Sequence, residues 1–345
     1  MEALSKALDS PVITFWIGRK PTIWINTASA ASELLDKRAT IYASRPYMLV
    51  FAELTGLGQS NLVNMYYGTR WRMQRKITHQ GVGLQQVRRY RGFQNNESQI
   101  MAMDILHDPA EYVAHMERYA TSVVSIIGFG RRVAKSDDPL ITEVIAVMHR
   151  AADLNVPGKS FPMVIETFPW LARFPRWVPW LRQFNSKGRG GDFFYALADE
   201  ANQESKHEDC YVKMLYREKD KYGLAKQEIA SLTGNLFGAG SDTSSSTLIT
   251  FVLACCAFPE TLPRAWEELD RVVGPNRSPT FDDDVDLPYT KALMKEVLRW
   301  RSVAIIGGQP HAPIQDDRWN GYLIPKNSWV QGNTRVLSLS ILLSC

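Results

Sequence analysis

The sequence predicts a mainly α-helical fold with a small β region, and three observations predict it. From about Gln227 to about Ala257, apolar or small residues recur every three or four positions, which is the repeat of one helix face. Two β-branched and aromatic runs, residues 12–16 and 22–26, flank a turn and indicate two strands. Farther along, Asn320-Gly321 lies between two short runs and is the commonest signal for a tight hairpin.

The other helices follow from the same periodicity. We expect helices over 28–37, from about Tyr67 onward, over 97–129, 140–154 and 259–273, and from Pro288 through Arg299. The segment 161–184 holds four prolines and three tryptophans with arginines between them, so it cannot be one helix. Such a segment suits a membrane interface or a pocket cover, and an aromatic-packed surface loop explains it equally well.

Composition restricts the class of protein. With 345 residues and 45% hydrophobic content, the chain can bury a large core. Its 40 basic and 36 acidic residues are interspersed, so nucleic acid is not the expected partner. The four cysteines have no zinc or disulfide spacing, and no signal peptide, membrane span or anchor is readable. We therefore expect an intracellular protein.

The long helix at 227–257 contains features that weaken it. Three glycines cost ~1 kcal/mol each in a helix interior, and Asp242 and Thr243 lie on or beside its apolar face. In one interpretation the glycines allow close packing against a neighbour, and the hydroxyls bond back to carbonyls one turn earlier. In the other, a flat ligand lies against Ala239 and Gly240, with Asp242 and Thr243 beside it as a proton-handling pair.

Two further pairs lie at helical spacing. Trp71 and Arg75 are four apart, and an indole N–H beside a guanidinium suits a carboxylate or phosphate. A basic solvated face with a half-buried tryptophan is the plainer interpretation. Glu296 and Arg299 are three apart and can form an ion pair, worth ~0–1 kcal/mol if exposed.

Taken in order with Pro310-His311-Ala312 and the Asn320-Gly321 hairpin, these fragments resemble the haem-thiolate monooxygenases, the cytochrome P-450 family, and fungal members most. The resemblance covers residues from about 12 to about 333. It implies a cytochrome P-450 fold, haem b as cofactor, O₂, a small hydrophobic substrate and an NADPH-dependent reductase as electron donor. It also implies peripheral membrane contact through the mobile region 161–184, and the endoplasmic reticulum membrane as the location of full-length relatives.

The resemblance assigns roles by matching position. Ala239 and Gly240 would line the distal face of the haem, and Asp242 and Thr243 would be the catalytic pair that manages protons for the bound oxygen. Donors to the haem propionates would be Trp71, Arg75 and His311, and the structural core pair would be Glu296 and Arg299. Carboxylate propionates suit charge-assisted donors of this kind.

The sequence departs from the family at the axial ligand. Family members place their cysteine in a Phe-x-x-Gly-x-x-x-Cys-x-Gly loop downstream of the hairpin, and this chain has no such loop. Cys345 lacks the loop's glycines and phenylalanine, so we assign no metal ligand. We expect a cytochrome P-450 domain over 1–335 that is truncated at both ends, followed by a non-family tail over 336–345.

Two functional hypotheses follow. In the first, the protein is a haem-dependent monooxygenase that inserts one atom of O₂ into a hydrophobic organic substrate. In the second, the polypeptide is a non-catalytic, haem-free fragment or binder from a mis-spliced or mis-annotated monooxygenase gene. The missing cysteine loop favours the non-catalytic hypothesis for the polypeptide itself. The order of its motifs favours the monooxygenase hypothesis for the gene from which it descends.

Overall fold

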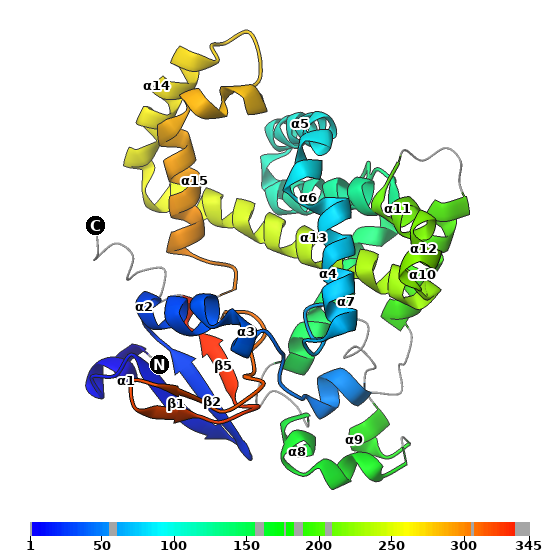
Figure 1. Ribbon diagram of the computed structural model, residues 1–345. Helices are drawn as coiled ribbons and strands as arrows, with labels where there is room; N and C mark the ends of the chain where they lie inside the picture. The colour runs from blue at the N-terminus through cyan, green and yellow to red at the C-terminus, as the bar shows by residue number, and fades with distance from the viewer. Residues whose placement is uncertain are drawn as a thin grey trace.

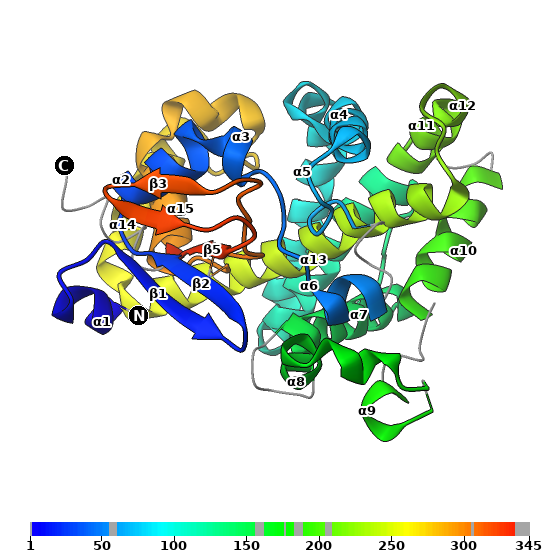
Figure 2. The ribbon, with the colours of Figure 1, turned by 60° about the horizontal axis from the view of Figure 1, so that its bottom comes forward.

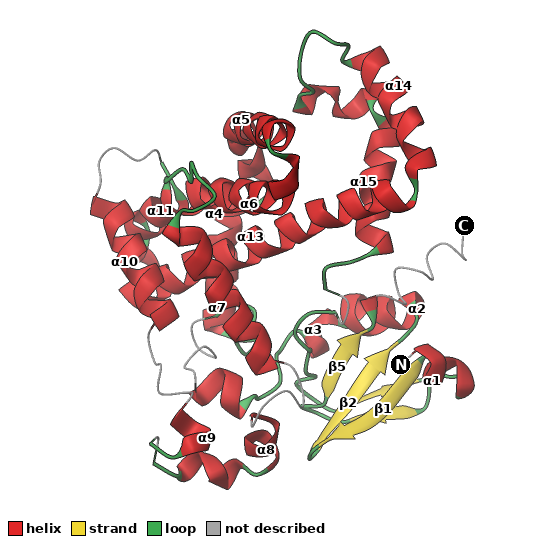
Figure 3. Ribbon diagram, turned by 180° about the vertical axis from the view of Figure 1, so that it is seen from behind, coloured by secondary structure: helices red, strands yellow, loops and turns green. Residues whose placement is uncertain are grey.

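A computed structural model describes residues 2–54, 61–155, 162–175, 177–182, 189–203, 209–304 and 307–334. The fold is mainly helical with small β-sheets at one side, as the sequence predicts (Figure 3). Cys345 and the predicted tail 336–345 lie outside the described residues.

The first half of the described chain carries two strands and the helices that follow them. Its elements are α1 (Glu2–Ala7), β1 (Val12–Ile17), β2 (Lys20–Ile25), α2 (Ala28–Ala31), η1 (Ser32–Lys37), α3 (Ala39–Tyr42), η2 (Leu49–Leu54), α4 (Thr69–Val82), α5 (Leu84–His107), η3 (Pro109–Glu111), α6 (Tyr112–Phe129) and α7 (Pro139–Asn155).

The second half carries the long helix and three further strands. Its elements are α8 (Pro162–Thr167), η4 (Pro169–Arg173), α9 (Pro179–Arg182), α10 (Arg189–Gln203), α11 (Tyr211–Arg217), α12 (Lys219–Tyr222), α13 (Lys226–Ala257), η5 (Pro259–Thr261), α14 (Leu262–Val272), η6 (Phe281–Asp286), α15 (Pro288–Trp300), β3 (Asp317–Trp319), β4 (Tyr322–Ile324) and β5 (Trp329–Gly332).

The long helix α13 organises the helical part, where it crosses between α6, α7 and α10 (Figure 1). Phe237 of α13 is fully buried between Phe129 of α6 and Phe194 of α10, with ring centroids 5.8 and 6.1 Å away. Aromatic pairs at these separations contribute about 0.5–1.5 kcal/mol beyond their area burial. The main core therefore forms where α6, α7, α10 and α13 meet.

The β region pairs strands from opposite ends of the described chain (Figure 2). β1 and β2 form the predicted antiparallel hairpin, and β5 adds to β2 in parallel. The parallel β5 is not in the sequence prediction, which joined residues 319–330 into a single strand pair. β3 and β4 form the predicted hairpin, with Asn320 and Gly321 at φ 46° and 83°, as a type I′ turn requires.

The helix predicted over 97–129 differs from the structure. The stretch 97–129 is divided into α5 and α6, because Pro109 lacks the amide hydrogen and disfavours the helical conformation in the residue before it. The proline-rich segment 161–184 is broken into α8, η4 and α9, as expected.

None of the described helices alone has the length and hydropathy to cross a membrane; α13 and α14 meet both criteria only as a pair bent by 97°.

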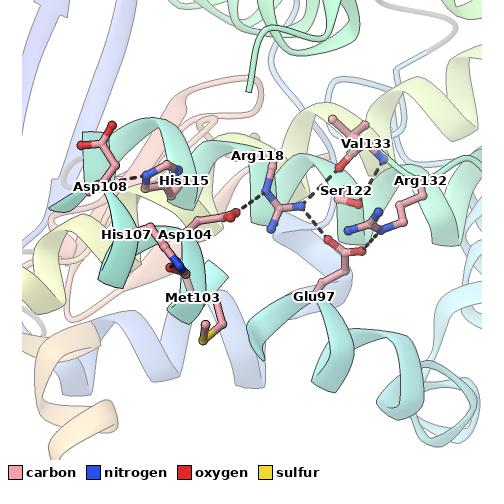
Figure 4. A network of polar contacts seen from close by, with 10 residues as sticks. All are labelled: Glu97, Met103, Asp104, His107, Asp108, His115, Arg118, Ser122, Arg132 and Val133. Carbon is pink, nitrogen blue, oxygen red and sulfur yellow. Dashed lines mark hydrogen bonds and ion pairs between the residues drawn. The ribbon is translucent and has the colours of Figure 1, made fainter. Parts of the chain in front are cut away.

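A buried ion network joins α5 to α6 (Figure 4). Arg118 of α6 and Glu97 of α5 are 1% and 2% exposed. Arg118 Nη1 donates to Glu97 Oε2 at 2.7 Å and to the Val133 carbonyl at 3.2 Å, and its Nε lies 3.3 Å from Asp104 Oδ2. The other Glu97 oxygen accepts from Arg132 Nε. Buried charges require such pairing, so this network fixes how α5 sits on α6.

Candidate functional site

One side of α13 packs against protein and the other is open. Ser241 and Ser245 are buried on the packed side. Ala239 and Thr243 are exposed and lie one turn apart, so they project from the same side of the helix. We call these two residues the open face of α13. Its side chains are small, so a planar molecule can approach the helix backbone there.

Two of the predicted glycines serve close packing between helices. A Cβ on Gly240 would lie 2.3 Å from Val124 Cγ1 of α6, and one on Gly234 would lie 2.7 Å from the Phe194 ring of α10. Gly240 thus permits the contact with α6, while Ala239 beside it contributes to the open face. The packing interpretation explains these glycines, and the open face is a separate feature of the same helix.

The hydroxyls along α13 bond back to carbonyls one turn earlier. Thr243 Oγ1 donates to the Ala239 carbonyl at 2.6 Å, and Ser241 Oγ donates to Phe237 in the same way at 2.8 Å. A hydroxyl has one donor and two acceptor lone pairs. Because its hydrogen is engaged by Ala239, Thr243 presents acceptor capacity to the open face.

Asp242 lies beside the open face and interacts electrostatically with Glu117 of α6. Burial raises the pKa of Glu117, the negative charge of Asp242 raises it further, and His149 of α7 opposes both. The charges of Asp242 on α13 and His149 on α7 therefore act in opposite directions on the Glu117 carboxyl of α6. A carboxyl with a raised pKa can hold a proton at higher pH than usual, which suits proton transfer.

Helix α4 carries Trp71 and Arg75 and is tied to the start of α13. Arg70 Nε donates to Glu228 Oε1 at 2.7 Å, and Gln74 Nε2 donates to the same oxygen at 3.0 Å. Trp71 Nε1 donates to the Leu62 carbonyl at 3.1 Å, so its hydrogen is used within the protein. Arg75 is exposed and has no ion pair or hydrogen bond in the described part of the chain.

His311 lies in the β region beside Arg45. Its Nδ1 lies 2.8 Å from the Tyr42 carbonyl, so Nδ1 carries the hydrogen and Nε2 is the free nitrogen. Burial lowers the pKa of His311, and the charge of Arg45 lowers it further. Arg45 Nη1 donates to the carbonyls of Gln309 and Pro310 at 2.7 and 3.2 Å. The structure therefore places a guanidinium next to an imidazole whose neutral form is favoured.

Glu296 and Arg299 form the ion pair that their spacing predicts. Arg299 Nε donates to Glu296 Oε2 at 2.6 Å, and a second hydrogen bond joins Nη2 to Oε1. The Arg299 side chain is 17% exposed and that of Glu296 is 50% exposed. The pair lies on α15, which packs against α13.

The described residues fit most of what haem requires. Ala239 and Thr243 offer a small-residue surface, and Arg75 offers donors suited to carboxylates, whereas His311 could donate from Nε2 only when protonated. An axial ligand is not found among the described residues near this face: Cys255 follows Thr243 by twelve positions, about 18 Å along the helix axis. No cluster of His, Cys, Asp or Glu suited to a metal ion occurs within the described ranges.

Sequence reasoning missed three contributors to this region. The sequence indicates only that Arg45 lies in a loop. It does not predict that Arg45 lies beside His311, which is far away in the chain. Glu117 faces Asp242 only because α6 packs on α13. Glu228, in the first turn of α13, had a readable signal, because an acidic residue there can accept from the helix's own first amides.

Comparisons with known proteins identify the family of this chain. The family model for cytochrome P450 matches residues 1–339. Cytochrome P450 monooxygenase 58 of Postia placenta is 31% identical over 94% of this chain and 62% of its own length. Cytochrome P450 monooxygenase verL of Clonostachys rogersoniana is 34% identical over 91% of this chain and 58% of its own length. The chain thus spans about three fifths of these relatives.

Solved structures show the same fold. A zebrafish cytochrome P450 with abiraterone superimposes with a TM-score of 0.77, covering 97% of this chain and 76% of that chain at 20% identity. The family match and the relatives named monooxygenases support the first functional hypothesis, and they do not favour the alternative of a non-catalytic, haem-free fragment or binder from a mis-spliced or mis-annotated monooxygenase gene. By its helical order, its open-faced central helix and a family match along nearly its whole length, this chain belongs to the cytochrome P450 family.

Proposed function

We propose that this protein is a haem-dependent monooxygenase that inserts one atom of O₂ into a small hydrophobic organic substrate. The observation that carries the proposal is the open face of α13, where Ala239 and Thr243 are exposed on a helix whose opposite side is buried. Membership of the cytochrome P450 family supports it. Bound haem b would supply the oxidising chemistry, and the protein would orient the substrate and deliver protons.

The chemistry of each side chain suggests its role in the proposed reaction. Ala239 would let the macrocycle approach the backbone, while Gly240 would hold α13 close against Val124 of α6, and Thr243 could accept a hydrogen bond from a molecule bound against the open face. Asp242, together with Glu117, would supply the protons. The donors for the propionates would be Arg75, His311 and, in addition, Arg45. Trp71 Nε1 donates to the Leu62 carbonyl and so holds α4 in place. It could donate to a haem propionate only by giving up this hydrogen bond.

His311 can donate from Nε2 only as an imidazolium, because its one hydrogen in the neutral form is already held at Nδ1 by the Tyr42 carbonyl. Since burial and Arg45 lower its pKa, the charged form is disfavoured at neutral pH in this structure. A propionate nearby would oppose that shift. Arg45 and Arg75 would therefore provide the permanent positive charge, and His311 would add to it as pH falls.

The test of the haem site uses two exposed alanines on the same helix. Ala239→Phe places a large ring on the open face, whereas Ala257→Phe makes the same change 18 positions, about 27 Å, farther along α13. We expect haemin, titrated into the purified chain and followed by its Soret band, to bind at least tenfold more weakly to Ala239→Phe. Ala257→Phe should bind as the parent does. Equal affinity in both variants contradicts this placement, and no haem binding by the parent contradicts the proposed function.

An electron donor would dock where α4 exposes positive charge. Arg72 and Lys76 are exposed on this helix, and both are cationic. An NADPH-dependent reductase with an acidic docking surface would be steered toward such a patch, and the association rate would fall as ionic strength rises.

The segment 162–182 would make peripheral contact with a membrane, as in family members held at the endoplasmic reticulum. Trp170 and Trp177 are 56% and 75% exposed, and Phe168 is 49% exposed. Trp16 of β1, 67% exposed, belongs to the strand whose turn touches this segment, because a Cβ on Gly18 would lie 2.3 Å from Thr167 Oγ1. Indole rings favour the headgroup region of a bilayer.

We expect the double variant Trp170→Ser, Trp177→Ser to lose most of its binding to phosphatidylcholine vesicles in a flotation assay. The control is Trp266→Ser on α14, where an indole of similar exposure, 57%, lies far along the chain from this segment. This control should float with vesicles as the parent does. Equal flotation of the double variant and the parent would show that the segment only packs on the protein surface.

A further inference from the structure

A cavity lies among the helices of the first half of the chain and α11, and neither residue of the open face of α13 lines it. It has a volume of about 520 Å³ and is lined by residues of α4, α5, α6 and α11, with none from α13. Cavities of about 300–1,000 Å³ are the usual size for small-molecule sites. Nothing in the proposed monooxygenase function uses this cavity.

The walls of this cavity combine aromatic rings with amide and guanidinium groups. Tyr90 and Phe93 of α5 are partner rings with centroids 5.7 Å apart, and Ile126 and Met214 line the cavity as well. Tyr90 is held in place because its hydroxyl donates to the Gly81 carbonyl at 2.8 Å. A planar apolar skeleton would therefore meet rings already fixed by the fold, which reduces the entropy lost on binding.

The charge in the cavity wall is positive. Arg217 and Asp209 form an ion pair at 2.8 Å, so they largely neutralise each other. Arg89 lines the cavity, is exposed and forms neither an ion pair nor a hydrogen bond within the described part of the chain. It lies near enough to Tyr90 for its charge to act on the phenol. Arg89 is thus a guanidinium with its donors available at the edge of an aromatic cavity.

We propose that this cavity binds a small aromatic carboxylate, with the ring system against Tyr90 and Phe93 and the carboxylate paired to Arg89. Guanidinium and carboxylate match each other in planar, two-donor geometry. The amide of Gln86, which also lines the cavity, can donate a further hydrogen bond to the anion. The site is distinct from the open face of α13 and does not depend on haem.

The test is equilibrium dialysis of the full chain against 2-naphthoate and its neutral isostere 2-naphthamide. We expect saturable binding of 2-naphthoate and about tenfold weaker binding of 2-naphthamide, the loss expected for one charge-assisted hydrogen bond. Arg89→Gln should bind 2-naphthoate about tenfold more weakly, whereas Arg88→Gln should bind as the parent does. Arg88 is the matched control, because it is also exposed on α5 but does not line the cavity.

A second variant separates this site from the proposed haem site. Ala239→Phe changes the open face of α13 and should leave 2-naphthoate binding unchanged, whereas Ile126→Trp fills the cavity and should abolish it. Far-UV circular dichroism establishes that each variant is folded. The proposal is overturned if the parent shows no saturable binding, if the amide binds as well as the acid, or if Arg88→Gln and Arg89→Gln weaken binding equally.

Discussion

Replacing Glu97 by glutamine should lower the free energy of unfolding by about 3–5 kcal/mol, because it leaves Arg118 buried without its principal counter-charge. The substitution conserves shape, so the loss reports charge and hydrogen bonding and not a cavity. Arg132 also loses the negative charge of Glu97. Because the Arg132 side chain is more exposed, it can turn toward water. Urea unfolding followed by circular dichroism measures the change.

The control for this prediction is Glu218→Gln on the surface. Glu218 pairs with Lys221 at 2.5 Å, and the two side chains are 35% and 63% exposed. Exposed pairs of this kind contribute about 0–1 kcal/mol, so the midpoint should hardly move. Similar losses in the two variants would show that the Glu97 network does not hold α5 on α6.

The same network predicts an acid-sensitive fold. Burial raises the pKa of Glu97, but hydrogen bonds from Arg118 and Arg132 outweigh it, so the pKa lies below the usual value. A group whose pKa is lowered in the folded state stabilises the protein fully above its unfolded pKa. That stabilisation is lost as pH falls through the folded value. Glu97→Gln should therefore melt with a smaller pH dependence below about pH 4 than the parent does.

Gly240→Ala should destabilise the protein by about 1–3 kcal/mol, although alanine is the better helix former by about 1 kcal/mol. The new Cβ would lie 2.3 Å from Val124 Cγ1. Valine in a helix has essentially one χ1 rotamer, so Val124 cannot turn away and α13 must move from α6. Because Ala239 lies on the same turn, haemin titration should weaken together with stability.

The double variant Gly240→Ala, Val124→Ala tests the reason for this loss. Removing the valine methyl groups provides room for the new Cβ, so the double variant should be more stable than the sum of the two single changes predicts. A strictly additive result in thermal unfolding would mean that the two residues do not share the contact. The destabilisation by Gly240→Ala would then come from a change in the helix backbone and not from contact with Val124.

Much of the fold can be read from the sequence, because the patterns behind it are local. The period of α13, the turn residues Asn320 and Gly321 and the prolines of 161–184 each act through neighbouring residues in the chain. The pairing of Glu296 with Arg299 also follows from helical spacing alone. The break between α5 and α6 has a local signal as well, in Pro109.

What the sequence could not predict depends on contacts between distant segments. The partner of Gly240 is Val124, and nothing within α13 identifies it. The same holds for Arg45 beside His311, and for Glu97, whose two arginines come from α6 and the loop that follows it. Whether a hydroxyl such as that of Thr243 faces solvent or a neighbour is also set by helix packing, which no single helix encodes.

The parallel pairing of β5 with β2 has a consequence for how the protein is made. Asn333, directly after β5, bonds to Asn26, directly after β2, and the two are 307 positions apart. During translation β1 and β2 leave the ribosome early, yet β2 keeps one edge without a partner until nearly the entire chain described here has been synthesised. Chaperones that shield β-strand edges should therefore stay with the nascent chain until β5 emerges.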